Sequence, residues 1–121
     1  MKNIIVDLDG TITIDDKDKQ YFEKEVNFSL VDKLKEYKAM GYKIVIFTAR
    51  NMNTYKGDLH KIKRYTLPLI LKWLDDNSIP YDEVIIGKPW CGFDGFYIDD
   101  KSIRPDEFIN LSYKEIKKII K

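Results

Sequence analysis

The sequence predicts an α/β fold in which helices cover both faces of a parallel sheet, giving a three-layer sandwich. Short β-branched apolar runs alternate with helical segments along the chain. These runs are continuous rather than alternating in polarity, which is typical of buried parallel strands. The 121 residues suffice for one continuous core but not for two. We therefore expect a single domain over residues 1–121.

The first strand is predicted at residues 3–8, an apolar β-branched run that stops before Gly10. Residues 11–27 are polar, mixed in charge and without a clear period, so they predict a loop or short hairpin that forms a small flap. Residues 29–40 predict a helix, with Leu30, Val31, Leu34 and Tyr37 on one face, Ser29 and Asp32 as a capping box, and Gly41 at its end.

The second half of the chain continues the alternation. A helix is expected at residues 61–77, with Pro68 starting a new segment or kinking it. Its apolar face is expected to contain Ile62, Tyr65, Leu69 and Trp73. Three further strands are predicted at residues 42–47, 83–86 and 93–98, and a closing helix at residues 112–121 begins with Ser112 and Glu115 as a capping box.

The composition narrows the class of protein. Lys and Arg number 21 against 20 Asp and Glu, and a net charge of +1 favours neither nucleic acid nor an anionic membrane as a partner. The single Cys91 cannot form an internal disulfide, and Met1 is not followed by a signal-like segment, so we expect a cytoplasmic protein. The apolar runs are shorter than the roughly 20 residues that a membrane span needs.

Polar clusters follow four of the predicted strands. In an open parallel sheet, ligands bind outside the carboxyl ends of the strands, so these clusters should meet at one edge. Together they supply carboxylates for Mg²⁺ and hydroxyl and cationic groups for phosphate. The clusters are Asp7-Leu8-Asp9-Gly10-Thr11, Thr48-Ala49-Arg50, Gly87-Lys88-Pro89 and Asp99-Asp100-Lys101.

The order of these motifs resembles that of the haloacid dehalogenase superfamily. Within it, residues 46–52, 87–90, 95–101 and 104–108 are similar to the short capsular polysaccharide biosynthesis phosphatases. The resemblance implies a Rossmann-like parallel sheet and an Mg²⁺-dependent phosphomonoesterase that forms an aspartyl-phosphate. It also implies a small phosphorylated substrate from capsular or surface polysaccharide biosynthesis, either a sugar phosphate or a phosphorylated amino alcohol.

The same resemblance assigns the site residues. Asp7 is the expected nucleophile, and Asp9 the general acid and base. Thr48 and Lys88 complete the catalytic set, with Lys88 stabilising the charge that develops in the transition state. The expected Mg²⁺ site comprises Asp7, Asp9, Asp99 and Asp100, where Asp9 contributes its backbone carbonyl and Asp100 has orienting Lys88 as an alternative. The expected substrate contacts are Gly10, Thr48, Ala49, Arg50 and Lys88.

Each of these residue types also has a structural interpretation. Asp7 and Asp9 could be turn-forming carboxylates, Thr48 a helix cap, and Lys88 a solvated surface residue. Arg50 could form a surface ion pair with a nearby carboxylate. For Tyr55, His60 and Trp90 the alternatives are surface exposure or ordinary packing.

The spacing of the motifs leaves no room for a substantial cap. Asp7 and Thr48 are 48 − 7 = 41 positions apart, and Thr48 and Lys88 are 88 − 48 = 40, most of which the predicted helices and strands occupy. An open cleft implies either a large substrate or a neighbouring subunit that closes it, which makes a homo-oligomer one expectation.

Three functions are compatible with this set of residues. The first is the phosphomonoesterase, and the second is a phosphotransferase or a protein or nucleotide phosphatase of the same superfamily. The third is a receiver-like phosphoacceptor signalling module. Receivers carry their acidic pair on the first strand and the accepting Asp on the third, whereas here the acidic pair comes last.

Overall fold

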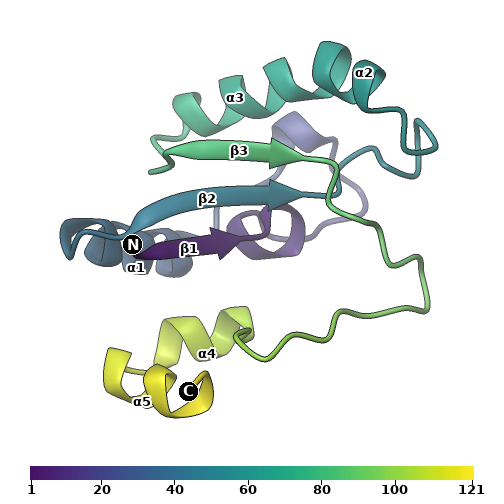
Figure 1. Ribbon diagram of the computed structural model, residues 1–121. Helices are drawn as coiled ribbons and strands as arrows, with labels where there is room; N and C mark the ends of the chain where they lie inside the picture. The colour runs from purple at the N-terminus through teal and green to yellow at the C-terminus, as the bar shows by residue number, and fades with distance from the viewer. The chain divides into compact units, whose positions relative to one another are not determined.

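The computed structural model describes all 121 residues as a small α/β chain. It divides into two compact units, Met1–Trp90 and Cys91–Lys121, which are described one at a time. The first unit contains the whole sheet, and the second is built from two short helices after an irregular segment (Figure 1). The organisation of residues 1–121 as one domain stays a prediction.

The sheet has three strands: β1 (Asn3–Val6), β2 (Lys43–Thr48) and β3 (Glu83–Ile86). Their order is β1-β2-β3 and both pairs are parallel, as predicted. The register pairs Val6 with Ile46 and Thr48 with Ile86, so the three strands finish at one edge (Figure 1). That edge is where the polar clusters of the first unit begin.

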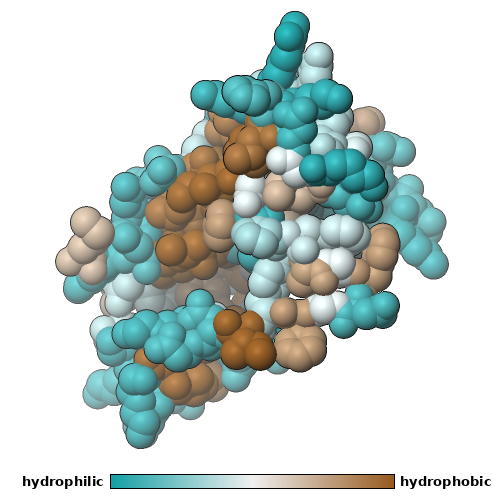
Figure 2. Space-filling view, turned by 45° about the vertical axis from the view of Figure 1, so that its right-hand side comes forward, coloured by the Kyte–Doolittle hydropathy of each residue, from teal (hydrophilic) through white to brown (hydrophobic).

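The central strand β2 forms the middle of the core. Ile44, Val45 and Ile46 are all buried, and because neighbouring residues in a strand point to opposite faces, both faces of β2 are covered. This is the burial expected of a layered α/β arrangement. The first strand differs from the prediction, because β1 is an edge strand and its Ile5 is 65% exposed. Apolar side chains also reach the surface elsewhere, between hydrophilic ones (Figure 2).

Helix α1 (Phe28–Ala39) buries the predicted apolar face of Leu30, Val31, Leu34 and Tyr37. It ends before Gly41, whose φ of 97° is favourable only for glycine. The predicted capping box of Ser29 and Asp32 is wrong. The N-cap is Asn27, and its Oδ1 accepts a hydrogen bond from the Leu30 amide at 3.3 Å. Asparagine is as good an N-cap as serine, and it lies one residue before the helix starts.

The predicted helix at residues 61–77 is made of three consecutive pieces. These are α2 (Leu59–Lys61), a wide π-helical turn η3 (Ile62–Thr66) and α3 (Leu67–Asp76), with Pro68 in the first turn of α3 as predicted. The predicted apolar face is only half right. Ile62 and Trp73 are buried, but Tyr65 and Leu69 are exposed. The wide turn holds more residues than an α-helical turn, so Thr66 and Ile70 face the core instead.

The second unit contains α4 (Pro105–Asn110) and α5 (Tyr113–Ile119). Ser112 and Glu115 form the predicted capping box of α5. The strand predicted at residues 93–98 is absent, because the chain turns there: a Cβ atom at Gly95 would collide with the Cys91 carbonyl oxygen. No helix in either unit has the length and apolar character needed to cross a membrane.

Candidate active site

The carboxylate of Asp7 lies at the end of β1, where the strand leads into a wide turn, η1 (Leu8–Ile12). Thr11 Oγ1 donates a hydrogen bond to Asp7 Oδ2 at 3.3 Å. Lys88 Nζ lies 3.5 Å from Asp7 Oδ1, and the Lys88 amide is fixed by donating to the Thr48 carbonyl at 3.1 Å. The parallel register thus brings the predicted nucleophile and the predicted cation together.

Burial raises the pKa of Asp7 above its ordinary value. The nearby Lys88 charge and a hydrogen bond from the Leu8 amide act in the opposite direction but do not cancel the effect of burial. Burial therefore makes ionisation of the Asp7 carboxylate less favourable than it is in water. Carboxylate oxygens are ligands that Mg²⁺ prefers.

Gly10 turns the chain immediately after Asp9. Its φ is 78°, and a Cβ atom there would come within 3.1 Å of Asp15 Oδ2, so a side chain would be both strained and crowded. The Gly10 amide donates to Thr13 Oγ1 at 3.1 Å, within the turn. The structure therefore uses this amide internally, although the sequence suggests Gly10 as a substrate contact.

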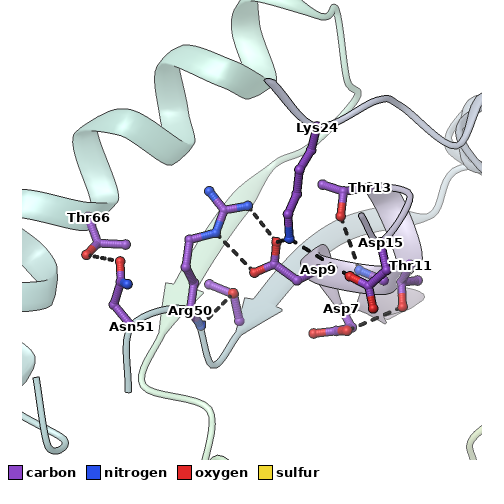
Figure 3. A network of polar contacts seen from close by, with 11 residues as sticks. Asp7, Asp9, Thr11, Thr13, Asp15, Lys24, Arg50, Asn51 and Thr66 are labelled. Carbon is purple, nitrogen blue, oxygen red and sulfur yellow. Dashed lines mark hydrogen bonds and ion pairs between the residues drawn. The ribbon is translucent and has the colours of Figure 1, made fainter. Parts of the chain in front are cut away.

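Asp9 is held by two cations from different parts of the chain (Figure 3). Arg50 Nε donates to Asp9 Oδ2 at 3.0 Å and Arg50 Nη2 donates to Oδ1 at 2.8 Å, which is a bidentate pair. Lys24 Nζ adds a third bond, 3.1 Å from Asp9 Oδ1. The Arg50 side chain is only 3% exposed, so the surface interpretation of Arg50 is wrong even though it does pair with a carboxylate.

These cations set the charge state of Asp9. Burial on its own would raise the pKa of Asp9, but the hydrogen bonds and charge of Arg50, followed by those of Lys24, outweigh burial and lower the pKa below its ordinary value. Asp9 is therefore ionised in this conformation and accepts a proton less readily than an unpaired carboxylate. It can donate one only after it has first been protonated.

The flap at residues 11–27 supplies Lys24. Its base is closed by an antiparallel bridge between Thr13 and Val26, with the Ile14 amide donating to the Glu25 carbonyl at 2.9 Å. A short 3₁₀ turn, η2 (Tyr21–Glu23), forms part of the flap, and the Tyr21 ring centroid lies 4.2 Å from Arg50 Cζ. Contact with Tyr21 and Lys24 is not foreseen from the sequence, because a polar segment without a period gives no sign of which side chains turn inward.

Thr48 is placed at the end of β2 as predicted and is buried. Its Oγ1 accepts a hydrogen bond from the Arg50 amide at 3.1 Å, and the hydroxyl keeps its own proton for a further acceptor. Ala49 lies between them and is half-buried. Asn51 has a φ of 63° and accepts a hydrogen bond from Thr66 Oγ1 at 2.7 Å, which ties this loop to η3.

Asp99 and Asp100 belong to the second unit, where both are exposed and Asp99 Oδ1 accepts a hydrogen bond from the Lys101 amide at 2.8 Å. The structure assembles no group of three or more His, Cys, Asp or Glu side chains of the kind that holds a metal ion. The expected four-residue Mg²⁺ site therefore stays a prediction. Of the other residues considered from the sequence, His60 is exposed in α2 and Tyr55 packs near Tyr65.

Comparisons with known proteins find similarity among solved structures. No family model matches the sequence, and no curated protein does. The crystal structure of an MCSG target from Vibrio cholerae is 49% identical, with a TM-score of 0.94 over 99% of this chain and 97% of that chain.

Two chains from structures of the Pnkp1/Rnl/Hen1 RNA repair complex also match, and they show only a shared fold. They are 21% and 24% identical, with TM-scores of 0.54 and 0.53. The matches cover 89% and 90% of this chain but only 29% and 34% of theirs. By its identity to the Vibrio cholerae protein over nearly the full length of both chains, this chain belongs to the same family as that protein.

Proposed function

We propose that this chain is an Mg²⁺-dependent phosphomonoesterase of the haloacid dehalogenase type that forms a phosphoaspartyl intermediate on Asp7. The observation that carries the proposal is the pairing at the strand ends. Asp7 Oδ1 lies 3.5 Å from Lys88 Nζ at the carboxyl edge of a parallel sheet, and Asp9 follows two residues later. Asp7 and Asp9 thus supply a nucleophile and a second carboxylate for proton transfer within one turn of the chain, and the sheet brings the Lys88 cation beside Asp7.

The proposed reaction has two steps. In the first, an Asp7 carboxylate oxygen attacks phosphorus, the bond from phosphorus to the ester oxygen breaks, and Asp9 in its protonated form gives its proton to the leaving oxygen. In the second, water attacks the phosphoaspartate, Asp9 takes the proton from that water, and inorganic phosphate leaves with the Asp7 carboxylate restored. Lys88 and the Thr48 hydroxyl bind the phosphate oxygens in both steps.

Mg²⁺ is the cofactor in this proposal. Asp7 and the Asp9 backbone carbonyl would hold it, with Asp99 and Asp100 as the further predicted ligands. Support comes from the donor chemistry, since all these groups offer oxygen. When bound, the cation would reduce the repulsion between the Asp7 carboxylate and the phosphate dianion.

The proposed substrate is a small phosphate ester from capsular or surface polysaccharide synthesis in the cytoplasm, either a sugar phosphate or a phosphorylated amino alcohol. The sequence motifs support this substrate class. The spacing of the motifs supports an open site, because it leaves no room for a substantial cap. A second copy of the chain would close such a site, so we also propose a homo-oligomer, to be tested by sedimentation or light scattering.

The proposal is tested by measuring phosphate release from a panel of esters with Mg²⁺ and with EDTA. The panel contains p-nitrophenyl phosphate, sugar phosphates, phosphorylated amino alcohols and nucleotides, and Asp7→Asn is the matched inactive control. Metal-dependent release that Asp7→Asn lacks would support the phosphatase. No release from any ester, together with stable labelling by acetyl phosphate, would replace it with the phosphoacceptor function.

A further inference from the structure

The bidentate pair between Arg50 and Asp9 does more than neutralise a charge. A guanidinium that donates through Nε and Nη2 to the two oxygens of one carboxylate fixes the plane of that carboxylate as well as its position. A lysine cannot reproduce this, because its ammonium is a point donor on a flexible chain. The orientation of Asp9 is therefore set by Arg50, from the loop after β2.

Burial makes this pair a rigid element. The Arg50 side chain is 3% exposed and that of Asp9 is 27% exposed, so little water competes for the guanidinium while part of the Asp9 side chain stays accessible. Exposed ion pairs exchange freely with solvent and hold little geometry. Asp9 is therefore held by Arg50 while part of its side chain stays open to a bound ester or a water.

The flap also contacts Arg50, through the ring of Tyr21. The Tyr21 ring lies with its centroid 4.2 Å from Arg50 Cζ and 4.9 Å from Lys24 Nζ, so both cations on Asp9 are in contact with one aromatic side chain. Tyr21 itself is 42% exposed and therefore covers the pair rather than forming part of the hydrophobic core. Without the ring, the guanidinium would have open space on that side and could turn away from Asp9.

We propose that Arg50 is a positioning residue for the Asp9 carboxylate and that Tyr21, from the flap, locks Arg50 in place. The inference rests on the proposed function, in which Asp9 transfers protons. It assigns the flap a part in catalysis: any movement of the flap that lifts Tyr21 also releases Arg50 and misaligns Asp9.

The kinetic test uses Arg50→Lys and Arg50→Ala with the best ester from the panel. Loss of general acid and base alignment should lower kcat by about 100-fold, with KM changed by less than about threefold because uniform binding of the ester is kept. Guanidinium ions should restore part of kcat in Arg50→Ala, while ethylammonium at equal ionic strength should not. Equal kcat in Arg50→Lys and the wild type, or no rescue of a folded Arg50→Ala, would overturn the proposal.

The role of the flap is tested by substitutions at Tyr21, with Phe22 as the control position. Tyr21→Leu should lower kcat by about 10-fold, and Tyr21→Phe, which keeps the ring face, should recover most of that loss. Phe22→Leu is the control, because Phe22 lies on the same short turn but is 77% exposed. A loss in Phe22→Leu equal to that in Tyr21→Leu would show general damage to the flap and would contradict the lock.

An NMR measurement distinguishes failure of this inference from failure of the proposed function. The Arg50 Nε–H resonance should exchange slowly with water in the wild type and in Phe22→Leu, and quickly in Tyr21→Leu. Slow exchange with no turnover of any ester would reject the phosphatase but keep the lock. Turnover in the wild type with fast exchange, or exchange that Tyr21→Leu leaves unchanged, would reject the lock but keep the phosphatase.

Discussion

Lys88 Nζ lies 3.5 Å from Asp7 Oδ1, although the two residues are 88 − 7 = 81 positions apart in the sequence. The contact exists because Asp7 follows β1 and Lys88 follows β3, and the parallel register ends both strands at one edge of the sheet. The fold thus converts two distant motifs into one cluster, and the predictions below depend on that cluster.

Lys88→Met should remove the cation beside the nucleophile. We expect kcat to fall by at least about 100-fold, since a positioned donor for developing charge typically contributes that much. Lys43→Met is the matched control: Lys43 lies at the start of β2, and its 3.7 Å pair with Glu83 involves two half-exposed side chains. Steady-state kinetics of both variants test the prediction, and similar losses in the two would contradict it.

Asp7→Asn should abolish turnover and make the protein more stable at neutral pH. Burial raises the pKa of Asp7 in the folded state above 3.8, so stability falls as pH rises through the interval from the unfolded value to that raised value. A neutral amide avoids this cost. Thermal unfolding at pH 7 without added metal should give a higher Tm for Asp7→Asn than for the wild type. A lower Tm would show that Lys88 compensates the buried charge fully.

Asp9→Asn should have the opposite effect on stability. The pKa of Asp9 is lowered in the folded state, so its ionised form contributes stability above pH 3.8 that is lost as the pH falls through the lowered value. The variant should unfold more easily than the wild type at pH 7, with a difference that shrinks in acid. Denaturant titrations at several pH values measure this. A difference independent of pH would count against the charged pairs with Arg50 and Lys24.

Asn27→Ala should destabilise the protein by about 1 kcal/mol, the usual effect of losing an N-cap. Asn27 Oδ1 accepts from the Leu30 amide, and its Nδ2 donates to the Thr11 carbonyl at 3.2 Å, so the side chain also joins α1 to the flap. Ser29→Ala should leave the unfolding free energy nearly unchanged. The reverse ranking in chemical denaturation would restore the capping box predicted at Ser29.

The sequence correctly predicted the helices and strands whose positions depend on the local pattern of apolar and polar residues. Three parallel strands, helix α1 with its buried face and the cap at Ser112 follow from periodicity and short-range hydrogen bonding. The strand-end motifs also indicated the cluster of Asp7, Thr48 and Lys88. Such features depend on residues within a few positions of each other or on the general geometry of parallel sheets.

The features that the sequence did not predict correctly depend on tertiary geometry. The wide turn η3 rotates the helical face away from Tyr65 and Leu69, and no periodicity encodes that rotation. Residues 93–98 have strand-like composition, yet Gly95 permits a turn and no ladder forms. Arg50 could be named from the sequence as a candidate site residue. Its bidentate pair with Asp9 and its contact with Tyr21 could not be predicted, because they depend on how the flap folds.

Detection of a phosphoryl group on Asp7 tests the proposed mechanism most directly. Asp9→Asn lacks both the acid of the first step and the base of the second, so it is incubated with Mg²⁺ and p-nitrophenyl phosphate, whose leaving group departs without a proton. The sample is then quenched rapidly and digested for mass spectrometry. We expect the mass of one phosphoryl group on the peptide that contains Asp7, and none when Asp7→Asn is treated in the same way. Phosphorylation of another residue, or turnover by the wild type with no label on Asp7 in Asp9→Asn, would contradict the mechanism.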